Sequence, residues 1–260
     1  MPEIAITAEL VKELRDATGI SIMQCRKALL EAEGDMEKAL LVLKKNSAEV
    51  AQKKADRETK DGRVAIKQKG RKSVLVALHC ETDFVAKNED FINLLEILSE
   101  KAFSNGAEKT KILAKDLIDP VIQKTGENII LGEIYELEGS TLGNYVHNNK
   151  SAVMVSLDGG TSELAKDIAM HVAAIKPEYI KASDIGEEAR RAMTEIFQKE
   201  VSKINKEEEI KKKMLQGKIS AYFKERTLLD QPFVKNPEET IGRLLEKNNA
   251  SVKEIKKYSI

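Results

Sequence analysis

The sequence has no tryptophan, few aromatic residues (4%) and no excess of charge of either sign. Its 43 lysines and arginines balance 43 aspartates and glutamates, so no overall field draws the chain toward nucleic acid or an anionic membrane. The scarcity of aromatic rings also leaves little surface on which bases could stack. We therefore expect neither direct nucleic-acid binding nor membrane association to be its main role.

Cysteine is nearly absent, and long apolar runs do not occur. Cys25 and Cys80 are the only cysteines and stand far apart in segments that look buried, which excludes a disulfide framework and a cysteine zinc site. No stretch reaches the roughly 18 apolar residues of a membrane-spanning helix. The start Met1–Ile4 lacks the basic and apolar regions of a secretory signal. We expect a cytoplasmic protein.

Motifs for nucleotide, metal or covalent chemistry are also missing. Neither G-x-x-x-x-G-K-[ST] nor G-x-G-x-x-G occurs, so the chain is not expected to bind a nucleotide itself. The histidines at positions 79, 147 and 171 have no metal-ligand spacing, and no metal or cofactor is expected. His79 beside Cys80 suggests a base and a thiol, but neighbouring strand residues point to opposite faces. A buried structural Cys80 is the stronger interpretation, and an enzyme is the weakest hypothesis.

The first 52 residues predict a small bundle of helices. Thr7 can cap a helix that ends before Gly19, and Ser21 with Gln24 predicts a capping box at the start of a second helix. Gly34 ends that helix, and Asp35 can cap a third. Charge then dominates residues 53–61, which predicts a linker.

The middle of the chain alternates in the manner of strands. Alternation on both sides of Lys69-Gly70 predicts a hairpin, followed by a helix through Phe91 and Leu98. Lys72–Leu78 resembles Lys150–Leu157, and each is followed by a helical pattern. This favours two duplicated α+β subdomains, with chance similarity of two apolar strands as the alternative.

Residues 186–225 lose the strand signal and keep apolar residues at helical spacing, which predicts an inserted antiparallel coiled-coil hairpin with Asn205 at its turn. A further helix is expected to open at Pro237, and a last strand to pass through Tyr258. The fold class is therefore α+β. The predicted parts are a three-helix domain (1–52), a linker (53–61), an N-terminal core subdomain (62–148), a C-terminal core subdomain (149–185 and 226–260) and the hairpin (186–225).

The loop at residues 81–90 is unusual because an aromatic residue, Phe84, stands where a loop tip is normally polar. Two interpretations are open. Phe84 is exposed for a partner, or it folds back onto the following helix as a hydrophobic staple.

Several motifs resemble the elongation factor Ts family. Thr82–Asn88 resembles the family signature, and Leu14–Gly19 followed by Cys25–Leu29 resembles its N-terminal motif. Further matches occur in the family's order at Gly34–Ala39, His171–Ala174, Lys176–Tyr179 and Gln231–Val234. The resemblance covers essentially the whole chain.

The resemblance implies a non-enzymatic guanine-nucleotide exchange factor of translation elongation whose partner is the GTPase elongation factor Tu. It implies that the N-terminal helices form a ubiquitin-associated-like (UBA-like) domain. In that family the Asp-Phe pair enters the GTPase near its magnesium site and promotes release of GDP and Mg²⁺, after which GTP rebinds. The partner-binding residues it implies are Thr82, Asp83, Phe84 and Val85 in the loop, Arg15, Ile22, Met23 and Arg26 in the N-terminal domain, and His147, Phe233 and Val234 in the C-terminal subdomain.

Two departures from the family bear on these contacts. Ile22–Arg26 replaces the frequent Met-Met-Asp-Cys-Lys, although apolar volume and positive charge persist. Many members also continue into a C-terminal helical module beyond the position of Ile260, which leaves the contact made by that module an open question for this chain. The alternative function is a general interaction module whose N-terminal helices bind ubiquitin-like or ribosomal partners, but it gives no reason for an exposed Phe84.

Overall fold

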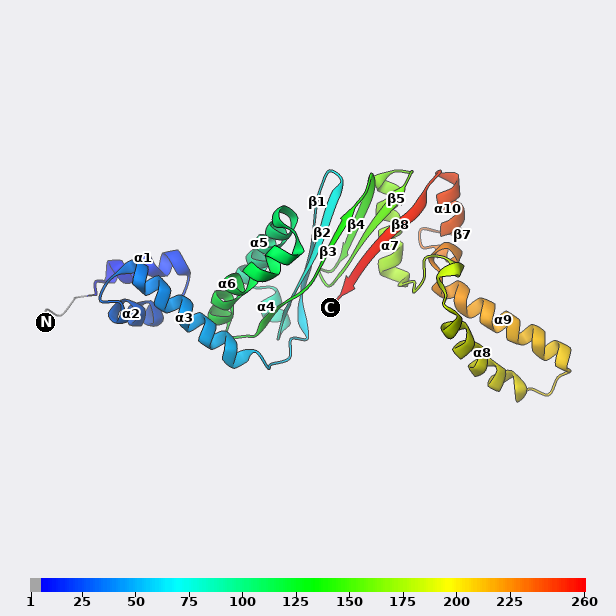
Figure 1. Ribbon diagram of the computed structural model, residues 1–260, viewed down its shortest axis with the longest axis horizontal. Helices are drawn as coiled ribbons and strands as arrows, with labels where there is room; N and C mark the ends of the chain where they lie inside the picture. Colours follow the sequence, from blue (N-terminus) through cyan, green and yellow to red (C-terminus); the bar gives the residue numbers. More distant parts are fainter. Residues whose placement is uncertain (1–5) are drawn as a thin grey trace. The chain divides into compact units, whose positions relative to one another are not determined.

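The computed structural model describes residues 6–260, and helices and small sheets together give the predicted α+β class (Figure 1). The chain forms two compact units. The first extends to Glu136 and also takes in Val146–Ala152 and Tyr258–Ile260, and the second comprises Leu137–Tyr145 and Val153–Lys257. None of the helices within residues 6–260 is both long enough and apolar enough to cross a membrane.

The chain begins with the expected helices, α1 (Ala8–Thr18), α2 (Ile22–Glu31) and α3 (Met36–Lys54). The hydroxyl of Thr7 accepts the N–H of Leu10, and Gly19 ends α1 at φ 66°, a conformation that glycine adopts without strain. Ser21 caps α2, but the capping box is only half formed because Gln24 Oε1 accepts the Ser21 hydroxyl instead of its backbone N–H.

These helices bury a small cluster of their own, which includes Leu14, Cys25, Ala28, Leu29, Ala39 and Leu43. Helix α3 runs further than the predicted start of the linker and contains Lys53 and Lys54. Its last turns are stabilised by packing that local composition does not reveal, since Ala51 joins the core of the next sheet. At the other end of the predicted linker, Asp61 is already in a strand. The division into domains remains a prediction.

The first sheet has the order β1-β2-β3, formed by β1 (Asp61–Lys69), β2 (Lys72–Cys80) and β3 (Ile129–Glu138). β1 and β2 pair antiparallel with Lys69 opposite Lys72, which confirms the predicted hairpin. Between β2 and β3 lie α4 (Asp83–Ala86), α5 (Glu89–Asn105) and α6 (Ala107–Thr125). Helix α6 was not predicted, and Pro120 lies inside it.

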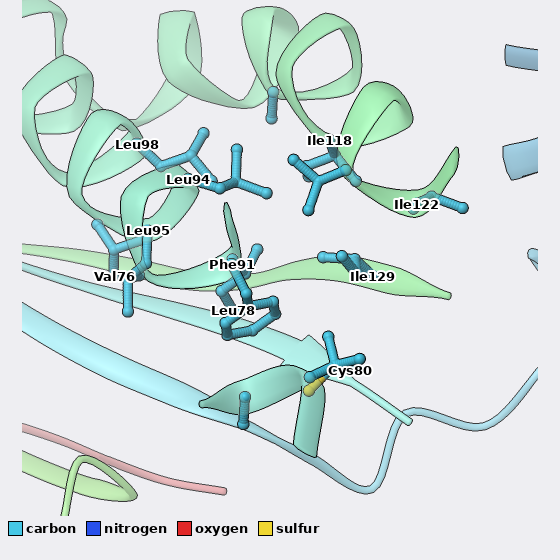
Figure 2. Packing of buried hydrophobic residues seen from close by; sticks show 14 of the residues in the cluster. Val76, Leu78, Cys80, Phe91, Leu94, Leu95, Leu98, Ile118, Ile122 and Ile129 are labelled. Carbon is cyan, nitrogen blue, oxygen red and sulfur yellow. The ribbon is translucent and has the colours of Figure 1, made fainter. Parts of the chain in front are cut away.

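Apolar side chains from α5 and α6 pack onto one face of this sheet (Figure 2). Phe91 is fully buried. The other labelled members of the cluster are Leu94, Leu95, Leu98, Ile118 and Ile122 from the helices, and Val76, Leu78, Cys80 and Ile129 from the strands. This core provides the rigid base under the loop that follows β2.

The second sheet has the order β4-β5-β8, formed by β4 (Thr141–His147), β5 (Ser151–Asp158) and β8 (Ser251–Ser259). The remaining elements outside the hairpin are α7 (Ser162–Ile175), β6 (Pro232–Phe233), β7 (Asn236–Thr240), α10 (Ile241–Lys247) and short 3-10 turns at Ala182–Asp184 and Leu228–Asp230. The buried cluster of this part of the chain includes Val155, Leu157, Ile168, Val172, Leu228 and Ile241.

The prediction that a helix begins at Pro237 is wrong. Pro237 lies in the exposed strand β7, and α10 begins at Ile241, where the hydroxyl of Thr240 accepts the N–H of Arg243. A proline fits the edge of a small sheet, where its missing N–H costs nothing. The threonine cap therefore marks the helix start.

The two similar segments occupy equivalent strands, since β2 and β5 are each the middle strand of a three-stranded sheet. Each is followed by a helix capped by a threonine, Thr82 for α4 and Thr161 for α7. This supports the duplication, which remains a prediction.

The inserted segment forms two helices, α8 (Glu187–Ser202) and α9 (Glu208–Arg226), joined by a turn that contains Asn205 (Figure 1, yellow to orange). Contacts between the helices include Lys218 over the ring of Phe197, at 5.7 Å from the ring centroid. Phe223 near the base is 6% exposed and packs edge-on against Tyr179. The helical hairpin is thus present, while its coiled-coil geometry remains a prediction.

Candidate partner-binding site

Phe84 lies on the one-turn helix α4, directly after the buried strand β2, and its side chain is 80% exposed. The next two residues, Val85 and Ala86, are buried in the core (9% and 3% exposed). An aromatic ring is thus held in solvent on a firmly packed base. The hydrophobic-staple interpretation of Phe84 is wrong.

The burial of Val85 corrects one expected contact. A side chain in the core of the protein does not reach a partner, so Val85 anchors the loop and Phe84 is the apolar residue that it presents. Thr82 is partly buried, and its polar groups are used within the chain as described below.

Asp83 points to solvent beside Phe84 and forms an ion pair with Lys87, with 2.6 Å between Oδ2 and Nζ. The hydrogen bond that Lys87 donates to Asp83, together with the negative charge of Asp83, raises the pKa of Lys87. The exposed surface of α4 therefore combines an aromatic ring with a paired carboxylate.

Thr82 fixes the start of α4 through several hydrogen bonds. Its hydroxyl oxygen accepts the N–H of Val85 at 3.4 Å, which caps the helix. The same hydroxyl donates to Oε1 of Glu127 at 2.6 Å, and the backbone N–H of Thr82 donates to Oε2 of Glu127 at 3.0 Å. Sequence reasoning missed Glu127 because it lies 45 residues away, before β3, and no local pattern links it to Thr82.

Cys80 does not have the properties of a nucleophile. It is fully buried, and burial, with the negative charges of Asp61 and Glu127, raises the pKa of its thiol to about 12. His79 Nε2 lies 2.8 Å from the hydroxyl of Tyr258 and is engaged there. Thiol chemistry at Cys80 is therefore not supported.

A hollow of about 1030 Å³ lies between α3, α6 and β3. Its floor is apolar, with Ala51, Ala114 and Ile118 among its lining residues, and Lys115 and Asp119 at its side pair with each other at 2.7 Å. No three His, Cys, Asp or Glu side chains within residues 6–260 come together as metal ligands.

Three of the four N-terminal candidates meet at one groove. Arg15, Ile22 and Arg26 line a hollow of about 530 Å³ between α1 and α2. Met23 is 77% exposed and lines an adjoining hollow, to which Arg26 also contributes. The structure therefore brings these four side chains to one apolar surface with cationic edges.

The C-terminal candidates differ in exposure. His147 is exposed at the end of β4, and Val234 is 42% exposed. Phe233 is only 6% exposed and belongs to the core, where its ring lies 6.2 Å from that of His171. In the free chain the Phe233 side chain is a core residue, and its direct contact with a partner stays a prediction.

Comparisons with known proteins give one consistent result. The family model described as elongation factor TS matches residues 81–260. Elongation factor Ts of Teredinibacter turnerae is 41% identical and aligns over 99% of this chain and 91% of its own length. The proteins of the same name from Hahella chejuensis (40% identical, 98% and 92%) and Pseudomonas fluorescens (41% identical, 95% and 88%) are similar to the same extent. The chain belongs to the elongation factor Ts family.

Proposed function

We propose that this chain is a non-enzymatic guanine-nucleotide exchange factor for elongation factor Tu. It binds the GDP-bound GTPase, promotes release of GDP and Mg²⁺, and allows GTP to rebind during translation elongation. Membership of the elongation factor Ts family supports the class of function. The observation that carries the mechanism is the 80% exposed ring of Phe84 on a buried base.

An exposed aromatic ring can bind in an apolar pocket of a partner. Burying a phenylalanine removes a large apolar area from water, so Phe84 gains free energy when it inserts between elements of a partner. Val85 and Ala86, packed in the core, keep the ring from rotating back into its own subdomain. Phe84 therefore acts as a wedge.

The partner's magnesium ion is sensitive to such a wedge. Mg²⁺ requires nearly ideal octahedral coordination at short distances, so a small displacement of its ligands or waters lowers its affinity steeply. Asp83 stands next to Phe84 and brings a negative charge toward the polar groups that support the ion. By linkage, the factor weakens nucleotide binding by the same ratio by which nucleotide weakens factor binding.

Surfaces outside the loop at residues 81–90 contribute further binding free energy. The groove of Arg15, Ile22 and Arg26 offers apolar area with guanidinium groups at its edge, which suits a surface that combines an apolar patch with carboxylates. Val234 and His147 are the exposed candidates for further contacts.

The wedge is tested by stopped-flow release of labelled GDP from elongation factor Tu. Phe84→Ala is expected to lower the maximal release rate roughly thirtyfold, the size of an interface hot spot. Its melting temperature stays at the wild-type value because the ring is exposed. Ile112→Ala, at a residue with 79% exposure on α6, is the matched control and keeps the wild-type rate. Phe84→Ala and Asp83→Ala variants that both release GDP at the wild-type rate rule the wedge out.

A further inference from the structure

Both donors of Thr82 are directed at a single carboxylate. The hydroxyl of Thr82 lies 2.6 Å from Glu127 Oε1, and its N–H nitrogen lies 3.0 Å from Glu127 Oε2. Hydrogen bonds to an ionised acceptor are stronger than neutral ones. The Cys80 thiol adds a third contact, since its Sγ lies 3.1 Å from the Thr82 carbonyl oxygen. With a pKa raised to about 12 by burial, this thiol keeps its proton and remains a donor. We call Thr82, Glu127 and Cys80 the Thr82 clamp.

Glu127 is itself held in place by its neighbours. The adjacent Asn128 donates its N–H to Oε1 of Glu81 at 2.6 Å. The side-chain amide of Asn128 donates to the carbonyl oxygens of Ala55 (3.3 Å) and Arg57 (2.9 Å). The segment that carries Glu127 is therefore tied both to the end of β2 and to the chain that follows α3. A carboxylate on such a segment is a fixed reference point for Thr82.

Helix α4 needs this support because it has only four residues. An isolated helical turn is unstable in water, since the first turn fixes several backbone dihedrals for one hydrogen bond. At its other end, Arg63 Nη1 donates to the carbonyl oxygen of Ala86 at 3.4 Å. Contacts from outside the helix thus hold both of its ends, and between them lie the two exposed residues Asp83 and Phe84.

We infer that Glu127 is a positioning residue for nucleotide exchange: through Thr82 it holds α4 in the conformation that presents Asp83 and Phe84 to the partner. The inference rests on the proposed function. Without the clamp, part of the binding free energy of Phe84 is spent on ordering α4, so the clamp acts by preorganisation. Glu127 need not touch the GTPase.

The test combines Glu127→Ala with Phe84→Ala in a double-mutant cycle, using release of labelled GDP from elongation factor Tu. Glu127→Ala is expected to lower the maximal release rate roughly tenfold, the equivalent of one to two hydrogen bonds to a charged group. The factor concentration at half-maximal rate changes less, because the groove of Arg15 and Ile22 is untouched. In the Phe84→Ala background, the effect of Glu127→Ala is much smaller, since Phe84 is gone and only Asp83 is left to be positioned.

Three further variants and a hydrogen-exchange measurement separate positioning from general stability. Thr82→Val loses the hydroxyl and resembles Glu127→Ala, while Thr82→Ser, the conservative variant, restores most of the rate that Thr82→Val loses. Glu96→Ala, at an exposed glutamate of α5, is the matched control. Hydrogen exchange of the Ala86 and Lys87 amides, which donate to Thr82 and Phe84 carbonyls, should quicken in Glu127→Ala while the amides of β2 stay protected.

Each outcome decides the inference. If GDP release is slow with Phe84→Ala but as fast with Glu127→Ala as with wild type, the positioning role of Glu127 is wrong and the wedge stands. If the two substitutions lower the rate multiplicatively, Glu127 acts through the fold as a whole and the positioning role is wrong. If Phe84→Ala is itself fast, the wedge fails and the clamp loses its role in exchange with it.

Discussion

Lys87 Nζ lies 2.6 Å from Asp83 Oδ2, one helical turn further along the chain, so the carboxylate beside Phe84 is already paired in the free protein. Both side chains are largely exposed, at 71% for Lys87 and 50% for Asp83. Ion pairs in such positions form and break easily in water and are screened by salt. A partner that requires the charge of Asp83 therefore competes with Lys87 for it.

Replacing Lys87 with methionine should free Asp83 without disturbing the fold. We expect GDP release up to roughly threefold faster than wild type at low salt, which is the scale of an exposed ion pair. This advantage should shrink as salt is added, and the melting temperature should not change. Stopped-flow release at two ionic strengths measures the effect. Slower release, by the factor seen for Asp83→Ala, would mean that Lys87 itself contacts the GTPase.

Local chemistry explains what could be predicted from sequence at this site. An aromatic residue in a polar loop singled out Phe84, and the alternation on both sides of Gly70 predicted the hairpin that leads to it. Spacing alone left two conformations of Phe84 open, because a staple depends on which residues around it are already buried. In the structure Val85 and Ala86 are packed in the core and Phe84 is exposed, so Phe84 does not form a staple.

Long-range contacts account for what the sequence did not reveal. Glu127 meets Thr82 across 45 residues, and no periodicity encodes such a pair. Helix α6 carries Pro120 and was missed, although it buries Ile118 and Ile122 against the first sheet. Pro237 was assigned to a helix start because proline suits both a first helical turn and an exposed strand edge.

The buried His171 is hydrogen-bonded to the backbone of the exposed residue Val234. It is fully buried, its Nε2 lies 2.9 Å from Gln231 Oε1, and its Nδ1 accepts the N–H of Val234 at 3.2 Å. The Gln231 amide nitrogen donates to the Glu225 carbonyl, so its oxygen faces the imidazole as an acceptor. These partners require the neutral ring with its proton on Nε2. Burial lowers the pKa of His171 below its ordinary value of 6.5.

The lowered pKa of His171 predicts a loss of stability on mild acidification. The unfolded chain takes up a proton as the pH falls through 6.5, before the folded chain does, so the free energy of unfolding falls below that pH. The loss ends once the pH is below the folded pKa. The slope for this residue is at most about 1.4 kcal/mol per pH unit. Urea unfolding at pH 7.5 and 5.5 measures it.

His171→Gln keeps a hydrogen-bond donor and an acceptor but removes the titrating imidazole. Its free energy of unfolding should therefore fall less between pH 7.5 and 5.5 than that of the wild-type chain. Burial, together with the charge of Lys150, also lowers the pKa of His79, which contributes with the same sign. His79→Gln is therefore the matched variant. The variant with both substitutions should show the smallest change in the free energy of unfolding between pH 7.5 and 5.5. Equal pH dependence in wild type and His171→Gln would show that this imidazole does not set the acid response.

The base of the helical hairpin packs against residues outside the hairpin. Besides packing against Tyr179, Phe223 lies under the guanidinium of Arg190, at 5.5 Å from the ring centroid. Arg226 pairs with Glu178 at 3.2 Å. Removal of the whole predicted hairpin, residues 186–225, would therefore take away a buried aromatic residue together with the solvent-facing helices.

Removing only residues 200–217, with a short glycine-serine turn in their place, should leave the melting temperature of the rest of the chain unchanged. The cut keeps the contact between Lys218 and Phe197 and the packing of Phe223, and it removes Glu200, which pairs with Lys218, and the buried Val201. Phe223→Ala in the full-length chain is the contrasting variant and should cost about 3 kcal/mol, as expected for a large buried side chain. Circular dichroism melts compare the two. If the tip deletion destabilises as much as Phe223→Ala, the distal helices contribute to the fold and the hairpin is not an independent projection.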